Sequence, residues 1–166
     1  MSMYNGLDMA VCLINMLIDK AKETEKKEYY SNFIKIHKLL FIAQCYSYAK
    51  DGKPLFESKI TANGDGPYIW SMSAKIPGHC GFGQIDQRIS TVDVGASVVF
   101  LSNRMKDILE TVINKYGHLS TMDIVLLTKS TTAWKISYDE EQKESRNIID
   151  PIWMFADGCQ LFSEEI

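Results

Sequence analysis

The side chains best suited to chemistry in this sequence are three histidines, His37, His79 and His118, together with four cysteines. None of the histidines stands four residues from another His, Cys, Asp or Glu, the spacing that places two metal ligands on one helical face. His79 and Cys80 could share a metal with His118 only if the fold brought distant loops together. A small metal-binding protein or enzyme that uses these three residues therefore stays an alternative. The cysteines show no paired spacing, which favours reduced thiols.

A glycine-rich segment, residues 77–83, has the kind of composition found in phosphate-binding loops. It lacks the Lys-Ser/Thr pair that completes a P-loop, and no clear strand leads into it. The acidic residues 139–141 are typical of a solvated turn. No nucleophile stands in a pattern that supplies a base and oxyanion donors. The sequence therefore predicts a protein that is not an enzyme, with no catalytic residue, no metal ligand and no cofactor.

The length and charge of the chain narrow the classes of protein to which it can belong. Its 166 residues, 46% hydrophobic and 23% charged, suit one globular domain over residues 1–166. A formal net charge of −3 argues against a broad nucleic-acid surface, because such surfaces gather Lys and Arg. The apolar run of residues 9–18 follows no basic segment and is too short to span a bilayer. We expect a cytoplasmic protein with neither nucleic acid nor membrane as partner.

The elements that would position functional residues are organised around one helix, predicted over about residues 31–50. Apolar residues recur at helical spacing from Phe33 to Tyr46 and cover most of the circumference, so the helix is expected to be buried on most sides. Gly52 should end it in the left-handed conformation, and Pro54 follows where no further turn is wanted. The clearly polar positions of this helix are Lys35, Lys38, Gln44, Ser47 and Lys50.

Capping residues mark further helices on both sides of this one. Asp8 can cap the first, Ser102 and Ser120 open two later ones, and Asp150-Pro151 starts the last, with proline in the first turn. Gly117 is expected to close the helix that begins at Ser102.

Shorter elements are predicted between these helices. Residues 63–67 are dense in turn formers and predict a shaped loop, and a short helix could begin within residues 70–76. Residues 84–90 and 92–100 carry β-branched side chains in strand-length pieces and predict a small strand pair. The predicted fold is mainly α (α+β): about six helices around the central buried helix, with a small antiparallel β element.

Several short motifs occur in a fixed order along most of the chain. They are Lys38-Leu-Leu-Phe-Ile-Ala-Gln44, Gly52-Lys-Pro-Leu-Phe56, Gly66-Pro67, Lys115-Tyr-Gly-His-Leu-Ser120, and Leu126-Leu-Thr128 followed by Trp134. Together they resemble the signature of the Panacea domain, the family of SocA-like antitoxins from bacterial and phage toxin–antitoxin pairs. The chain departs from the family pattern at Gly64, Asp65, Lys129 and Ala133.

The resemblance implies a non-catalytic protein that binds and neutralises a cognate toxin protein. In one branch of the family it further implies a proteolytic adaptor, which delivers the toxin to a AAA+ protease. A phage-encoded inhibitor of a host protein, built on the same domain, is an alternative that the sequence does not separate from a toxin partner.

The departures from the family pattern fall at polar positions in two loops, whereas the apolar helical positions keep the family character. A domain that serves different toxins must vary its contacts, and loops tolerate variation because they carry little of the packing. We therefore predict that the loop of residues 63–70 and the turn of residues 129–134 form the partner surface. Its predicted contact residues are Asn63, Asp65, Tyr68, Trp70, Lys129 and Trp134. The predicted structural motif residues are Gly52, Pro54, Gly66, Pro67 and Gly117.

Overall fold

The computed structural model describes residues 3–72, 74–77, 83–141 and 147–166. Within these residues the chain is mainly helical, with a small antiparallel sheet, as predicted. The elements in chain order are α1 (Gly6–Thr24), the 3-10 turn η1 (Lys27–Tyr29), α2 (Phe33–Asp51), β1 (Ile60–Asn63), β2 (Gly66–Ile69), α3 (Thr91–Val94), α4 (Asn103–Tyr116), α5 (Thr121–Lys129), α6 (Thr132–Ser137), β3 (Asn147–Ile148) and α7 (Pro151–Leu161).

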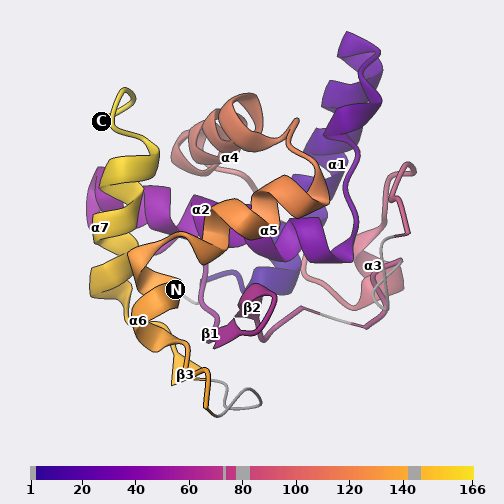
Figure 1. The fold of residues 1–166 in the computed structure, drawn as a ribbon. Helices are drawn as coiled ribbons and strands as arrows, with labels where there is room; N and C mark the ends of the chain where they lie inside the picture. Colours follow the sequence, from indigo (N-terminus) through magenta and orange to yellow (C-terminus); the bar gives the residue numbers. More distant parts are fainter. Residues whose placement is uncertain (1–2, 73, 78–82, 142–146) are drawn as a thin grey trace.

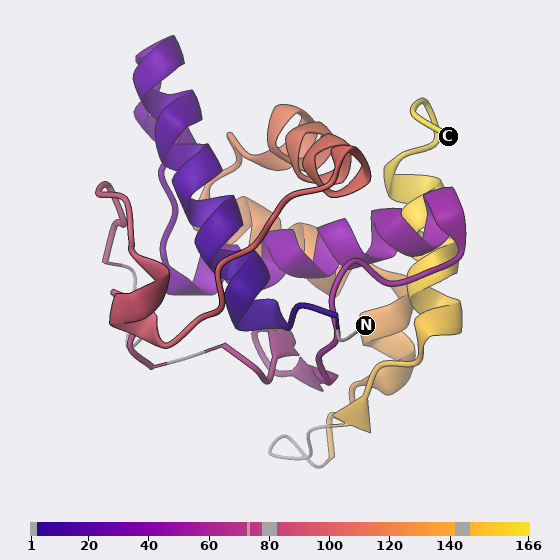
Figure 2. The ribbon, with the colours of Figure 1, turned by 180° about the vertical axis from the view of Figure 1, so that it is seen from behind.

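Helix α2 is the centre of the molecule, as its apolar circumference predicted. Every residue from Lys35 to Ser47 is buried, including the polar ones. Helix α5 crosses one side of α2 and α1 crosses the opposite side, while α7 packs against its C-terminal half (Figures 1 and 2). The Asn32 side chain caps the start of α2, and Gly52, with a φ of 72°, ends it in the left-handed region.

Helix α7 approaches α2 so closely that only glycine fits at the crossing. A Cβ atom on Gly158 would clash with the backbone oxygen of Cys45. Beyond this point, the Phe162 ring stacks on Tyr46, with 4.3 Å between ring centroids. The end of the chain is therefore fixed to the core by backbone contact and by aromatic packing.

The observed sheet differs in place from the predicted one. Strands β1 and β2 form a hairpin in the register Ile60↔Ile69 and Asn63↔Gly66, and β3 pairs with the other edge of β1. The predicted strand pair at residues 84–90 and 92–100 is wrong: the described part of this segment holds the short helix α3 and a single bridge from Ile85 to Ser31. Val92, Val94 and Val98 would share one face of a strand, yet Val94 is buried whereas Val92 and Val98 are 83% and 61% exposed, so no continuous buried sheet face forms there.

Two local predictions are wrong, and others are confirmed. The first helix is capped by Asn5; Asp8 lies in its first turn and closes a capping box. The described residues between 70 and 76 form turns rather than a short helix. Helices α4, α5 and α7 begin at the side-chain caps that the sequence predicted. No helix within the described residues is long and apolar enough to cross a membrane.

Candidate partner-binding surface

The two segments predicted to form a partner surface lie side by side in the structure. The indole Nε1 of Trp134, at the start of α6, donates a hydrogen bond of 2.8 Å to the backbone oxygen of Asn63, at the end of β1. On the other side of the hairpin, α5 packs against β2. The name hairpin surface is used below for the β1–β2 turn (residues 63–66), the end of β2 with Trp70, and residues 129–134.

The turn between α5 and α6 is held by hydroxyl and carboxylate groups. The Thr131 hydroxyl accepts from the backbone N–H of Trp134 and so caps α6. The carboxylate of Asp157, which is buried on α7, accepts from the N–H groups of Thr132 and Ala133 at 3.0 and 2.7 Å. These bonds fix the backbone at the start of α6, which lowers the ordering cost of binding at this turn.

Trp134 lies beneath this surface rather than on it. Only 9% of the residue is exposed, and its ring stacks on Tyr138 with 4.5 Å between centroids. The ammonium of Lys129 lies 5.2 Å from the centre of the same ring. Trp134 therefore positions Asn63 and Lys129, and it offers little area of its own to a partner.

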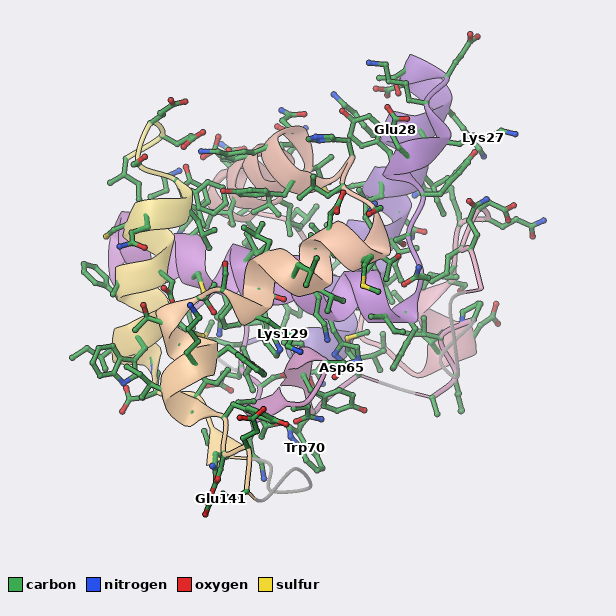
Figure 3. The ribbon with its side chains drawn as sticks, viewed as in Figure 1. Lys27, Glu28, Asp65, Trp70, Lys129 and Glu141 are labelled. Carbon is green, nitrogen blue, oxygen red and sulfur yellow. The ribbon has the colours of Figure 1, made fainter. Side chains whose placement is uncertain are left out.

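Trp70 is the aromatic side chain that this surface exposes. It is 39% exposed, and its Nε1 donates a hydrogen bond of 2.8 Å to the Thr61 hydroxyl. Its ring meets Tyr68 edge to face, and the Lys59 ammonium lies 4.8 Å from the ring centre. Figure 3 shows Trp70, Asp65 and Lys129 on the same side of the molecule, contributed by the hairpin and by α5. These contacts hold an exposed ring in a fixed orientation.

A buried lysine lies directly under the hairpin turn. Lys38 of α2 is 1% exposed, and its Nζ donates to the backbone oxygen of Pro67 at 3.1 Å. The carboxylate of Asp65, which is 61% exposed, lies 3.9 Å from the same nitrogen. Burial lowers the pKa of Lys38 from 10.5 to about 8; Asp65 opposes this shift, and Lys129 adds to it. Among the described residues, the ammonium beneath the turn therefore donates a hydrogen bond to Pro67 and lies near the Asp65 carboxylate.

Gly66 and Pro67 fit closely over Lys38. Gly66 has a φ of 117°, which side chains rarely adopt, and a Cβ atom there would lie 3.0 Å from Cε of Lys38 and 3.3 Å from Oγ1 of Thr128. The predicted structural role of the Gly-Pro pair therefore has a physical cause: one residue must leave room for Lys38, and the other presents a carbonyl to it.

His37 supports β2 from below. The backbone N–H of Ile69 donates to its Nδ1 at 2.9 Å, and its ring stacks on Tyr68 with 4.3 Å between centroids. Burial first, and then the charge of Lys38, lower the pKa of His37 from 6.5 to about 3, so the ring is neutral at physiological pH. A neutral ring with an occupied Nδ1 serves as a packing and positioning group.

The remaining structural motif residues fix loops to α2 and lie away from this surface. Gly52 caps α2, and Gln44 holds the segment that follows, which contains Pro54. The Gln44 side-chain oxygen accepts from the N–H groups of Leu55 and Phe56, and its Nε2 donates to the Phe56 carbonyl. Gly117 follows α4 in the ordinary helical region and not in the left-handed one. Its carbonyl accepts a hydrogen bond of 2.7 Å from Lys35.

The structure gives the metal-site alternative no support among the described residues. His79 and Cys80 lie outside those residues, and His118 is exposed next to the start of α5. Within the described part of the chain, no three His, Cys, Asp or Glu side chains are grouped so that they could hold a metal ion.

Sequence reasoning missed the contacts of His37 and Lys38 with the hairpin. Both were assigned to the helix, but neither was expected to contact the hairpin. A weak signal existed, because the apolar residues around them left almost no room for a solvated stripe on α2.

Residues 36–135 match the family described as antitoxin SocA-like, Panacea domain. The chain belongs to this family. The match covers α2 from Ile36 onward, the hairpin, α3, α4, α5 and the start of α6, and so includes all the residues of the hairpin surface. No curated protein and no solved structure matches the chain.

Proposed function

We propose that this protein is an antitoxin that neutralises a cognate toxin by direct contact through the hairpin surface, without catalysis. The observation that carries the proposal is the hydrogen bond from Trp134 to Asn63. It joins two segments that are distant in sequence, and both carry this chain's departures from the family pattern. Membership of an antitoxin family supports a toxin as the partner.

The physical character of the surface suits protein recognition. Interface energy concentrates in a few aromatic and charged anchors that are already held in place before binding. Trp70 is such an anchor, because it is partly exposed and bonded to Thr61. Asp65 and Lys129 supply one charge of each sign beside it, which favours a partner with complementary charges.

A growth assay tests the toxin partnership. Genes adjacent to the gene for this protein are expressed singly, and any product that stops growth is co-expressed with it. We expect growth to recover and the toxic protein to co-purify in stoichiometric amount with this chain. Absence of a toxic neighbour, together with capture of no stoichiometric small protein from the native host, would contradict the proposal. Capture of a host enzyme instead would favour the inhibitor alternative.

Two tryptophans of nearly equal exposure locate the interface. Trp70 is 39% exposed on the hairpin surface and Trp153 is 37% exposed on α7. We expect Trp70→Ala to weaken toxin binding by about 2 kcal/mol or more, as loss of a central anchor does, and Trp153→Ala to leave it unchanged. Binding is measured by calorimetry and folding by thermal melting. The reverse result would place the interface on α7.

The mode of neutralisation needs a separate measurement. A protein that only blocks its toxin leaves the toxin's half-life unchanged or longer, whereas an adaptor shortens it only in cells that contain the AAA+ protease. The half-life of the toxin in cells with and without each such protease therefore distinguishes blocking from delivery.

A further inference from the structure

A second candidate site lies at the start of α5, away from the hairpin surface. A cavity of about 280 Å³ opens between the loop that precedes α2 and the loop that joins α4 to α5. Its lining includes Ser31, Lys35, His118, Ser120 and Thr121. The last three belong to or follow the Lys115–Ser120 motif, to which the proposed antitoxin function assigns no role.

The side-chain hydroxyl of Ser31 is buried and, among the described residues, unpaired. The residue is 3% exposed, and its hydroxyl has no partner among the residues that the structure describes, although its backbone oxygen accepts from Ile85. Buried hydroxyls almost always have a partner, because an unpaired one loses its bonds to water without replacement. A cavity wall that contains such a group is suited to a ligand that accepts a hydrogen bond.

Lys35 gives the same cavity a positive charge. It is 2% exposed, and its Nζ donates to the backbone oxygens of Glu28, Tyr30 and Gly117 at 2.9, 3.4 and 2.7 Å. These carbonyls satisfy the hydrogen bonds of the ammonium without neutralising its charge, which the exposed carboxylate of Glu28 offsets in part. An anion in the cavity would feel this charge across a medium that screens poorly.

The N-terminus of α5 adds hydrogen-bond donors. Ser120 caps this nine-residue helix by accepting from Asp123, so the N–H groups of Thr121 and Met122 remain in the first turn, where no helical carbonyl can reach them. The Asn32 side chain bonds the Thr121 hydroxyl at 2.6 Å, which holds this helix end beside Ser31. Free first-turn N–H groups favour bound oxyanions.

We propose that this cavity binds a small phosphate group, either as inorganic phosphate or on a free mononucleotide. The Ser31 hydroxyl and the first-turn N–H groups of α5 donate to its oxygens, and the Lys35 charge stabilises it. The exposed carboxylates of Glu28, in the cavity wall, and Asp123, in the first turn of α5, oppose a ligand of large negative charge. A ligand with a single phosphate group therefore suits the cavity better than a di- or triphosphate.

Titration of the isotope-labelled protein tests this site against an internal control. Inorganic phosphate, and then adenosine monophosphate, are added at constant ionic strength while backbone amide shifts are recorded. We expect saturable shifts at Ser31, Thr121 and Met122. The N-terminus of α4 has the same type of serine cap, at Ser102, and should show no saturable shift. Tighter binding of the nucleotide would identify it as the natural source. Equal responses at the two helix ends would overturn the proposal.

The variant Ser31→Ala separates ligand binding from folding. It removes a hydroxyl that has no partner in the described part of the chain, so its melting temperature should equal or exceed that of the wild type. We expect its phosphate Kd to rise about tenfold, the usual loss for one hydrogen bond to a charged ligand. The exposed Ser130→Ala serves as the control and should keep the wild-type Kd. An unchanged Kd for Ser31→Ala would overturn the assignment.

Discussion

Two buried lysines on α2, Lys35 and Lys38, have very different surroundings. They lie one turn apart, are 2% and 1% exposed, and burial lowers the pKa of each from 10.5 to about 8. The Nζ of Lys35 donates to three backbone carbonyls. The Nζ of Lys38 donates to the Pro67 carbonyl and lies 3.9 Å from the exposed carboxylate of Asp65.

This difference separates a structural region from the region that we propose for recognition. The Lys35 bonds tie α2 to the segment before it and to the end of α4, and every one of them ends on the backbone. Lys38 instead supports a single turn, and its nearest carboxylate is solvated on the hairpin surface. Regions that bind partners often hold fewer internal contacts than the frame around them. The region around Lys38 fits that description.

The largest effect is expected from filling the space above Lys38. Gly66→Val places a β-branched side chain at a φ of 117° and within 3.0 Å of Lys38. We expect unfolding free energy to fall by about 3 kcal/mol or more, from backbone strain and steric clash together. The neighbour Gly64 is the control, because a Cβ atom there meets only the Tyr138 hydroxyl, at 3.7 Å. Chemical denaturation that shows equal losses for Gly64→Val and Gly66→Val would contradict this account of the turn.

Removing each ammonium in turn tests the comparison itself. Lys35→Met leaves three carbonyls without their donor, and we expect it to cost about 2 kcal/mol. Lys38→Met leaves only the Pro67 carbonyl and relieves an equally buried charge, so we expect a change within about 1 kcal/mol. Both values come from urea denaturation at pH 7. A larger loss for Lys38→Met would reverse the roles given to the two lysines.

The lowered pKa that the two lysines share predicts an unusual pH dependence of the unfolding free energy. Between the folded pKa of about 8 and the unfolded value of 10.5, the unfolded chain binds more protons, so unfolding free energy rises with pH. We expect each lysine to add about 1 kcal/mol between pH 7 and pH 9. Above that range Cys12 opposes the trend, because burial raises its pKa from 9.0 to about 11. Each methionine variant should lose about half of the rise, and a flat profile in the wild type would contradict the burial of both charges.

The sequence predicted the helices well because their signals are local. Ser102, Ser120 and Asp150 cap helices as expected, and the apolar circumference of α2 indicated its central place. The hairpin was interpreted as a loop, because its strands have four residues each and its turn formers dominate the segment. An Asn-Gly pair between short apolar runs was the available signal for it.

The surroundings of the lysines were beyond local patterns. Polar positions on an amphipathic helix normally face water, and only the packing of the hairpin and of α4 shows that Lys35 and Lys38 do not. The partner-surface residues were chosen from their departures from the family pattern. That they meet in space depends on the contact between Trp134 and Asn63, which no spacing in the sequence encodes.

The most direct measurement of the proposed function is hydrogen exchange of the protein alone and in complex with its toxin. The account predicts slower exchange on binding at the amides of the hairpin surface, which are those of the β1–β2 turn, of the end of β2 with Trp70 and of residues 129–134, with α7 unchanged. Slower exchange confined to α7, where Trp153 is exposed, would contradict the account and would place the toxin-binding site on α7.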